Sequence, residues 1–345
     1  MATPQSDLDY PWPDPADPDA ITEVAPGLRW LRMPVPGPLG HVNVYVLDDE
    51  AGWTIVDTGV PNDATRGRWQ ALLEGALAGR PVARILCTHG HPDHVGQAAW
   101  LHQATGATVM MTRRELDLAR DPFGRILPQA EEVAAFYRRV GLEEDAIDGI
   151  VSRTFSREGA RLPLEGEGVE VIAAGDVIAI GGRRWRIVGG SGHSPEHACL
   201  YDPEGRILLA GDQILPAISP NVSVFPRRPD ADPLADFLAS LKRLETLPED
   251  TLVLPGHGLP FHGLHRRAAA LARHHRDHLD NVVAALGEPA PASRILPVLF
   301  RRALEGVQLV LAVGEALAHL NFLIGQGRVT RLPAGAGPDL YLRAG

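Results

Sequence analysis

The stretch THGHPDHVG, residues 88–96, places three histidines and one aspartate within six residues, directly after the apolar run 85–87. The apolar run indicates a buried strand, and residues 93–105 are predicted to form a helix with Asp93 in its first turn. The cluster therefore lies on a loop between a strand and a helix, where chemically active residues often gather. Imidazole nitrogens and a carboxylate oxygen suit zinc and, less selectively, iron or manganese.

The spacing within this stretch favours two ions over one. Asp93 and His94 are neighbours that cannot easily point at the same spot, so a second ion is expected beside the first. Further ligand types follow small residues at later strand ends: His193 in GSGHSPEH, Asp212 in LLAGDQ and His257 in LPGHG. Each of these three taken alone is more simply a surface or capping residue, but the set together predicts a dinuclear metal site.

Composition limits the class of protein. With 345 residues and 45% hydrophobic content, the chain can form one large domain, or a large domain and a small one. Neither an apolar run of about 18 residues nor an N-terminal signal pattern is evident, so a cytoplasmic protein without a membrane span is expected. Cys87 and Cys199 lie in apolar segments and are expected to be buried and unpaired. A net charge of −10 argues weakly against a broad surface for polyanions.

Periodicity and turn residues divide the chain into regions. Residues 1–25, rich in Pro and Asp, are expected to form an irregular arm, 26–262 a catalytic domain with a helical insertion at about 112–165, and 263–345 a C-terminal domain. Strands are expected at 28–35, 42–49, 53–59, 82–88, 169–174, 177–182, 183–190, 197–202, 206–212 and 251–258. Helices are expected at 64–78, 93–105, 113–120, 129–142, 233–247, 265–286 and within 305–329, followed by a hairpin.

The motifs resemble a known family. THGHPDH at 88–94, together with VDTG at 56–59, GHSPEH at 192–197, GDQ at 211–213 and GHG at 256–258, is similar to the metallo-β-lactamase-fold hydrolase superfamily over about residues 25–262. The resemblance implies an α/β protein, an αβ/βα sandwich with its metals at one edge between two sheets. It also implies that His89, His91 and His193 hold one ion, that Asp93, His94 and His257 hold the other, and that Asp212 bridges them. This complete ligand set is more similar to the glyoxalase II and lactonase branches than to the β-lactamases.

The resemblance also implies a mechanism. Two divalent cations, most simply Zn²⁺ with Fe or Mn as alternatives, would hold a bridging hydroxide by lowering the pKa of water from about 15.7 to about 7. Asp93 is the catalytic candidate, because such an aspartate can hold the hydroxide or pass a proton to the leaving group. Asp57 either orients a ligating imidazole or is a turn residue before Gly59, and the two alternatives are equally favoured. His197 is expected to support the site without binding metal.

Three further segments have two interpretations each. Residues 218–225, ISPNVSVF, border the pocket or form a surface loop, and the surface loop is favoured. Phe136 and Tyr137 line the substrate site or belong to the core, and their helical spacing favours the core. Residues 274, 275 and 278 are histidines on one helix, where an interdomain or solvated face is favoured over a separate metal site.

The C-terminal domain leaves the function open between two classes. Residues 263–345 resemble the small winged-helix module of some superfamily members, and they carry ten arginines against six acidic residues. The favoured function is hydrolysis of a small ester, thioester or lactone. The alternative is an RNA-processing endoribonuclease whose winged helix contacts RNA, and a non-enzymatic scaffold that dimerises through the module is disfavoured by the complete ligand set. The apolar faces of 307–320 are expected to pack against the catalytic domain or a second subunit of a homodimer.

Overall fold

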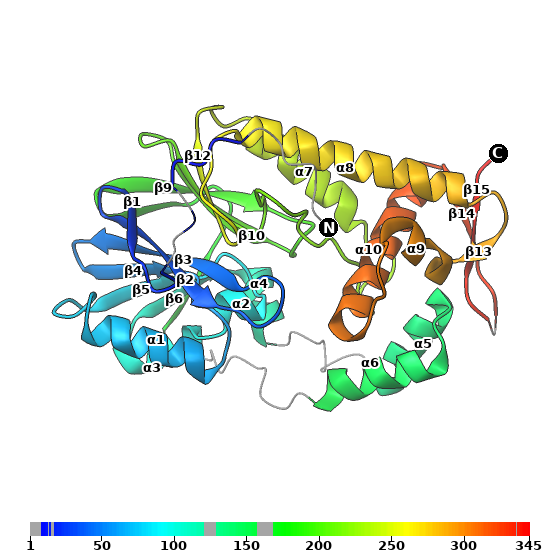
Figure 1. The fold of residues 1–345 in the computed structure, drawn as a ribbon, viewed down its shortest axis with the longest axis horizontal. Coiled ribbons are helices and arrows are strands. Elements are labelled where there is room, and N and C mark those ends of the chain that lie inside the picture. Colours follow the sequence, from blue (N-terminus) through cyan, green and yellow to red (C-terminus); the bar gives the residue numbers. More distant parts are fainter. Residues whose placement is uncertain (1–7, 13, 15–16, 121–128, 157–167, 336) are drawn as a thin grey trace.

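The computed structural model describes every residue except 1–7, 13, 15–16, 121–128, 157–167 and 336. Two facing β-sheets dominate the described part (Figure 1). The first sheet has the order β1-β2-β3-β4-β5-β6-β7, antiparallel from β1 to β4 and parallel from β4 to β7. Its strands are β1 (Thr22–Ala25), β2 (Leu28–Pro34), β3 (His41–Asp49), β4 (Gly52–Val56), β5 (Val82–Leu86), β6 (Thr108–Thr112) and β7 (Val169–Ile172).

The second sheet has the order β12-β11-β10-β9-β8. Its strands are β8 (Val177–Ile180), β9 (Arg183–Gly190), β10 (His197–Asp202), β11 (Ile207–Gly211) and β12 (Leu252–Pro255). β11 and β12 run parallel and are joined by α7 (Pro233–Leu244), whereas the other neighbours are antiparallel. The expected strands between residues 28 and 258 are all present, and β6 is a strand that the sequence reading did not predict.

Helices cover the outer face of each sheet. In β3, Val42, Val44 and Val46 face α1 (Asp63–Glu74) and its neighbours, whereas Tyr45 and Leu47 face the second sheet. The expected cap of α1 is present, since the Asn62 side chain accepts a hydrogen bond from the Thr65 amide. On the other side, α7 packs against β9 of the second sheet, and α8 (Leu264–Ala285) runs from the end of that sheet toward the C-terminal region (Figure 1). The αβ/βα sandwich predicted from the motifs is therefore confirmed.

The helix expected over 93–105 is interrupted. It consists of α2 (Pro92–Val95) and α3 (Ala98–Thr105), which are separated at Gly96. A Cβ at Gly96 would lie 2.4 Å from the Pro92 carbonyl oxygen and 2.6 Å from that of Gly59. The chain is thus packed so tightly against the Gly59 turn that it bends there instead of continuing as one helix.

The N-terminal arm is more ordered than its composition suggests. Residues 22–25, expected to be irregular, form β1 and extend the first sheet by pairing with β2. Val24 is buried, and Leu8, Tyr10 and Trp12 pack against the two cores that border the second sheet. Burial of these apolar side chains accounts for the order, because it offsets the low helix and strand propensity of the Pro- and Asp-rich segment.

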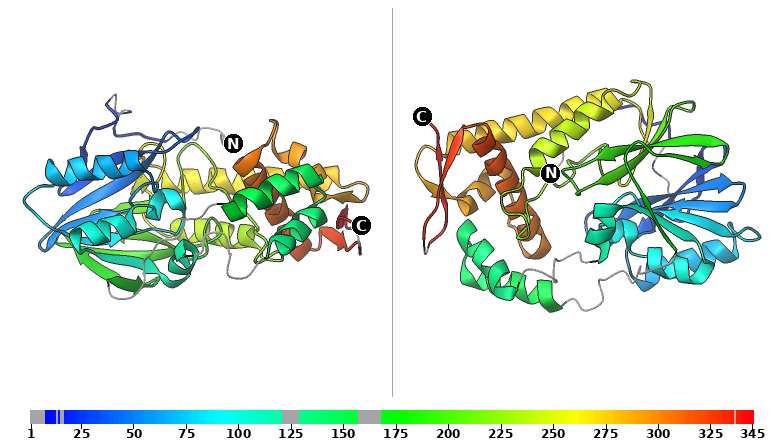
Figure 2. Two further views of the ribbon diagram at one scale, coloured as in Figure 1. Left: turned by 90° about the horizontal axis from the view of Figure 1, so that it is seen from below. Right: turned by 180° about the vertical axis from the view of Figure 1, so that it is seen from behind.

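The helical insertion contains α4 (Arg113–Arg120), α5 (Ala130–Val140) and α6 (Glu144–Ser156). Parts of the expected range, 121–128 and 157–165, lie outside the described residues. The pair α5 and α6 lies beside the C-terminal region in the views of Figures 1 and 2. Arg139 on α5 bonds the buried Asp339 at 2.8 Å, which ties the insertion to that region.

The C-terminal region consists of helices followed by a small sheet. After α8 come a short 3₁₀ turn (Ala292–Ile295), α9 (Leu296–Leu299) and α10 (Gly306–Gly325). The sheet has the order β13-β15-β14, with β13 (Ala290–Pro291), β14 (Val329–Leu332) and β15 (Leu340–Arg343). The expected hairpin is present, since β14 and β15 pair antiparallel, while the winged-helix assignment stays a prediction.

The apolar helix α10 packs inside the protein. Residues 312–320 are all buried, and the Val224 amide donates a hydrogen bond to the Gly314 carbonyl at 3.0 Å. A Cβ at Gly314 would lie 2.6 Å from that of Ser223, so the helix and the 218–225 loop are in close contact. Of the described helices, α10 alone is long and apolar enough to cross a membrane, but more than half of it is buried within the protein. The expected packing against the catalytic domain is present.

Candidate metal centre

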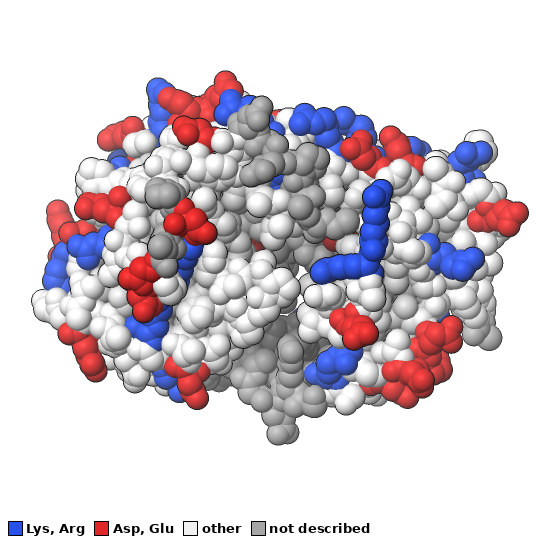
Figure 3. Space-filling model, in the orientation of Figure 1, with Lys and Arg blue, Asp and Glu red and all other residues white. Residues whose placement is uncertain are grey.

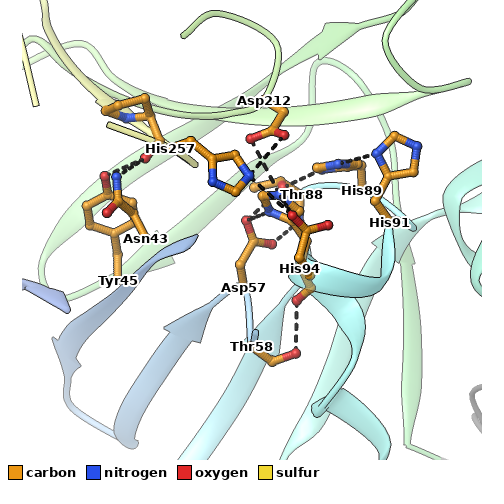
Figure 4. A network of polar contacts seen from close by, with 12 residues as sticks. Asn43, Tyr45, Asp57, Thr58, Thr88, His89, His91, His94, Asp212 and His257 are labelled. Atoms are coloured by element: carbon orange, nitrogen blue, oxygen red, sulfur yellow. Dashed lines mark hydrogen bonds and ion pairs between the residues drawn. The ribbon is translucent and has the colours of Figure 1, made fainter. Parts of the chain in front are cut away.

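The ligand candidates from the sequence gather at one edge of the sandwich, between the two sheets (Figure 4). We call them the strand-end cluster: His89, His91, Asp93, His94, His193, Asp212 and His257. The segments that follow β5, β11 and β12 carry all of them except His193, which precedes β10, and Asp93 and His94 belong to α2. Because β11 and β12 are parallel, their ends bring Asp212 and His257 side by side.

The first group of candidates consists of three imidazoles. The Nε2 atom of His89 lies 3.0 Å from Nδ1 of His91 and 3.3 Å from Nε2 of His193. Nitrogen ligands at 2.0–2.1 Å from a tetrahedral zinc ion are separated by about 3.3–3.4 Å, so these spacings suit one ion. Burial lowers the pKa of all three, that of His91 to about 3, and leaves the neutral form that binds metal.

The second group contains Asp93, His94 and His257, whose ligand atoms lie within 4.8 Å of one another. Oδ2 of Asp93 is 3.2 Å from Nε2 of His257 and 3.8 Å from Nε2 of His94. Asp212 lies between the groups, because its Oδ2 is 3.5 Å from Nε2 of His257 and 3.7 Å from Nε2 of His193. One carboxylate is therefore within reach of both groups.

Two buried atoms in the cluster have no hydrogen-bond partner. Nε2 of His94 and Oδ1 of Asp212 face each other at 3.4 Å without forming a hydrogen bond. Buried polar atoms are nearly always satisfied in folded proteins, and a cation beside these two would satisfy both. The residues present thus fit a bound divalent cation.

The charges of the cluster also favour a cation. Burial raises the pKa of Asp212, but the attraction of His257 and His94 outweighs it and holds that pKa well below the usual range. Burial likewise opposes protonation of His94, yet the carboxylates of Asp212, Asp57 and Asp93 raise its pKa well above the usual value. Ionised carboxylates that draw a proton onto a fully buried imidazole create a strongly negative environment.

Asp57 holds the loop that begins the cluster. Its Oδ2 lies 2.8 Å from Nδ1 of His94 and accepts a hydrogen bond from the Thr88 hydroxyl, and its Oδ1 accepts one from the Thr88 amide (Figure 4). The residue adopts φ 61°, which is uncommon outside glycine. Of the two sequence interpretations, the structure favours the ligand-orienting role, because the carboxylate fixes the His94 ring.

His197 contacts two members of the strand-end cluster and supports them, as expected. Its Nε2 accepts a hydrogen bond of 3.1 Å from the Asp212 amide, and its ring stacks on His89 with 4.8 Å between centroids. Gly211 makes room for it, since a Cβ there would lie 2.6 Å from Nε2 of His197. The backbone at Asp212 is thereby fixed.

Glu115, on α4, is a supporting residue that the sequence reading missed. It is fully buried, and its two carboxylate oxygens accept from the Gly90 amide at 2.8 Å and the Glu196 amide at 2.6 Å. It therefore joins the loop carrying His89 to the loop carrying His193. Within the charged segment RRELDLAR nothing distinguishes this glutamate from exposed neighbours, so no local signal could have found it.

The loop at 218–225 is not the surface loop that the sequence favoured. Its Asn221 carbonyl oxygen lies 2.9 Å from Nδ1 of His193, and Val222 and Val224 are buried. The surface interpretation is wrong because this loop is enclosed between His193 and α10. A carbonyl at Nδ1 leaves Nε2 of the imidazole free for metal.

A comparable contact holds His257 on the opposite side. Its Nδ1 lies 2.8 Å from the His41 carbonyl oxygen, and Asn43 and Tyr45 both donate to the Pro255 carbonyl (Figure 4). Strand β3 of the first sheet thus positions the end of β12 in the second.

Phe136 and Tyr137 do not lie in the metal centre. Both are buried in the core formed with α7, α8 and α10, and their rings pack edge to face at 5.0 Å. The core interpretation is confirmed.

A second set of histidines lies between α8 and α10. We call His274, His275, His278 and His319 the helical histidine cluster. His275 and His319 are fully buried, with their Nδ1 and Nε2 atoms 3.3 Å apart, and Nε2 of His275 lies 3.3 Å from the Ser219 hydroxyl. Among the described residues, all groups of three ligand atoms within 4.8 Å belong to the strand-end cluster. The interdomain interpretation therefore holds for the buried pair.

Comparison with protein families identifies this arrangement. A family model described as "Metallo-beta-lactamase superfamily" matches residues 37–257, which include the whole strand-end cluster. The chain belongs to this superfamily. A second model, described as "Metallo-beta-lactamase-like, C-terminal domain", matches residues 279–344. Both parts of the chain are thus accounted for by metallo-beta-lactamase families.

Solved structures agree over nearly the full length. A Beta-lactamase domain protein from Burkholderia ambifaria is 43% identical, with a TM-score of 0.88 and 98% of each chain covered. A metallo-beta-lactamase family protein from Thermus thermophilus is 31% identical, with a TM-score of 0.78, covering 93% of this chain and 100% of the other.

Among relatives similar in sequence, the hydroxyacylglutathione hydrolase GloC of Haemophilus influenzae is 26% identical, and the match covers 62% of this chain and 83% of GloC. The protein is a metal-dependent hydrolase of the metallo-beta-lactamase superfamily.

Proposed function

We propose that the protein hydrolyses a small ester, thioester or lactone with two divalent ions, most simply Zn²⁺, in the strand-end cluster. The observation that carries this proposal is the position of Asp212, whose Oδ2 lies 3.7 Å from the histidine of one group and 3.5 Å from that of the other. Seven ligand side chains exceed what one tetrahedral ion accepts, and a carboxylate between two groups suits a bridge. In this assignment His89, His91 and His193 hold one ion, and Asp93, His94 and His257 hold the second.

The chemistry depends on the placement of acid and base groups around these ions. When bound, the two divalent cations would lower the pKa of water toward neutrality and would polarise the oxygen of an ester carbonyl. Burial raises the pKa of Asp93, but His94 and the hydrogen bond from His257 outweigh it and lower the pKa to about 2. Asp93 is therefore ionised at neutral pH. Beside the two ions it would orient the attacking water and pass the proton of that water to the leaving group.

The charge distribution supports a small-molecule substrate over a polynucleotide. The net charge is −10, and the face drawn in Figure 3 mixes acidic and basic side chains without a broad basic area. The similarity to a hydroxyacylglutathione hydrolase supports acyl transfer to water as the reaction class. A cytoplasmic location remains part of this proposal.

The decisive experiment combines metal analysis with a substrate screen. Protein purified without chelator is expected to contain two ions per chain and to hydrolyse thioesters or lactones after loading with Zn²⁺, Fe²⁺ or Mn²⁺. One ion at full occupancy with no gain on added metal would contradict the dinuclear proposal. Cleavage of single-stranded RNA, with no activity on any ester, would replace the proposed substrate class.

Endoribonuclease activity is the second candidate, since residues 263–345 carry ten arginines and six acidic residues. Among these arginines, Arg328 pairs with Asp280 and Arg331 with Asp230, each at 2.8 Å. Productive RNA binding would release counterions, so affinity would fall by about 0.7–0.9 log units per phosphate contact for each tenfold rise in salt. We expect a shallow slope. Tight, steeply salt-dependent binding with RNA cleavage would favour the nuclease.

A further inference from the structure

A short series of contacts connects the C-terminal helix α10 to the metal centre. Nδ1 of the ligand candidate His193 lies 2.9 Å from the carbonyl oxygen of Asn221, on the 218–225 loop. The side-chain amide of Asn221 donates in turn to Oε2 of Glu315 on α10, at 3.3 Å. Two hydrogen bonds therefore separate a metal-binding imidazole from a carboxylate that is distant in sequence.

The rest of the loop is fixed to the same helix. Ser223 donates to Oδ1 of Asn221 at 2.6 Å and also contacts the Leu311 carbonyl at 3.1 Å. The Val224 amide bonds to the Gly314 carbonyl, where the close approach leaves no room for a Cβ. The side chain of Asn221 is thus held by both Glu315 and Ser223. The orientation of its backbone carbonyl therefore depends on α10.

Glu315 is an unusual residue for this helix. It is 8% exposed and lies among buried apolar positions of α10, and burial raises the pKa of its carboxyl to about 7. A buried carboxyl destabilises the folded protein unless its hydrogen bonds compensate, and Asn221 provides its side-chain hydrogen bond in the described part of the chain. Because burial of this carboxyl lowers the stability of the folded protein, we expect Glu315 to be needed for holding the 218–225 loop.

We propose that Glu315 is a positioning residue of the metal centre, which sets the direction of the His193 ring through Asn221. The C-terminal domain then completes the catalytic site, because the residue that holds Asn221, the partner of a ligand of the first ion, comes from α10. Groups that orient metal-binding imidazoles change metal affinity by about 10–100-fold when removed. Since Glu315 acts through one intermediate residue, the lower end of that range is expected. The inference rests on the metal centre of the proposed function and is independent of the substrate.

The test compares two replacements of similar length in the full-length protein. Glu315→Gln keeps an oxygen that can accept from Asn221, whereas Glu315→Met fills the same apolar space without that acceptor. The affinity for Co²⁺ is measured by competition with a chromophoric chelator, and the visible Co²⁺ spectrum reports ligand geometry. We expect the Met variant to bind the more affected of its two ions about 10-fold more weakly, with an altered spectrum. The Gln variant should remain within about twofold of wild type, since its acceptor oxygen is retained.

Two further variants make the result specific. Glu305→Ala, at the exposed start of the same helix, is the matched control and should leave both affinities unchanged. Asn221→Ala removes the same hydrogen bond from the loop side, and combining it with Glu315→Met should cost no more affinity than the stronger single change. Asn221→Ala also provides the test if the Met variant does not fold, as judged by circular dichroism.

The outcomes separate this inference from the proposed function. If the wild type binds two ions and Glu315→Met binds them with unchanged affinity and spectrum, the positioning role is wrong. Additive effects of the two changes would also overturn it, because Glu315 would then act by another route. A wild-type protein that binds no second ion would instead contradict the dinuclear centre itself.

Discussion

The strand-end cluster and the helical histidine cluster are alike in the sequence, since both place three histidines within six residues, yet their surroundings differ. In the first, imidazoles from separate loops converge around the carboxylates of Asp93 and Asp212. In the second, histidines on two helices face one another, and the buried pair bonds to the Ser219 hydroxyl and to the Glu315 carbonyl. A metal centre is therefore marked less by the number of histidines than by two other features. Carboxylates lie among the imidazoles, and the ligands converge from separate segments of the chain.

The largest effect is expected when the shared carboxylate is removed. Asp212→Ala should reduce metal affinity and hydrolysis by more than about 100-fold, because loss of an outer supporting residue alone costs about 10–100-fold. Both ions should be lost on metal analysis, whereas His257→Ala should mainly empty the second position. Equal loss of both ions from the two single variants would contradict the bridging role of Asp212.

The helical histidine cluster should respond through stability instead. His275 is fully buried and its ring lies 5.5 Å from that of Phe237, so His275→Ala leaves a cavity and removes the ring that contacts Ser219 and His319. We expect the free energy of unfolding in denaturant to fall by about 2–4 kcal/mol. Metal content should stay at the wild-type value, and a lost ion in a folded variant would mean that this cluster also binds metal.

Glu315 lies between the two clusters, and its protonation should appear in the pH dependence of folding. Its pKa, raised by burial to about 7 from the ordinary 4.5, means that the folded state binds a proton that the unfolded state has lost. Stability conferred by this proton is complete below about pH 4.5 and is lost as pH rises through 7. Glutamine carries no such proton, so the stability of the Glu315→Gln variant should not fall in this way. Between about pH 5 and pH 8, its free energy of unfolding relative to that of wild type should therefore rise by on the order of 2–3 kcal/mol. Chelator-treated protein is unfolded in denaturant at each pH, and Glu305→Gln, which should show no such gain, is the control.

The smallest effect is expected outside the ligand set. Asp57→Asn keeps the size of the side chain that holds His94 but removes its charge, so metal affinity and hydrolysis should fall by about 10–100-fold with the fold intact. Chelator competition and turnover measure the two losses. An unchanged affinity would show that the ring of His94 is oriented by packing alone.

Much of the fold and the ligand candidates could be predicted because each depends on local pattern. Alternation along 42–47 and the helical period of 64–74 require only neighbouring residues, and the density of histidine at 89–94 is visible without a structure. The helix break at Gly96 could not be seen, since it depends on a turn at Gly59 that is distant in sequence. The break in the helix is therefore set by a tertiary contact and not by the local sequence.

The supporting residues were the least predictable part of the site. Glu115 and Asn221 have ordinary sequence environments, and their roles arise from contacts with loops 25 and 28 residues or more away. Asp57 was suspected only because a carboxylate precedes a glycine at a strand end. Local sequence reports which side chains can bind a metal, but not which distant groups will orient them.

The two bonds made by Glu115 have a consequence for protein engineering. This glutamate belongs to α4, the first helix of the insertion, and it ties the loop of His89 to the loop before β10. A chimera that exchanges the insertion for that of a relative, in order to change which molecules reach the ions, must therefore cut after Arg120 and keep α4. A junction placed before α4 would release both loops and dismantle the centre that the graft was meant to redirect.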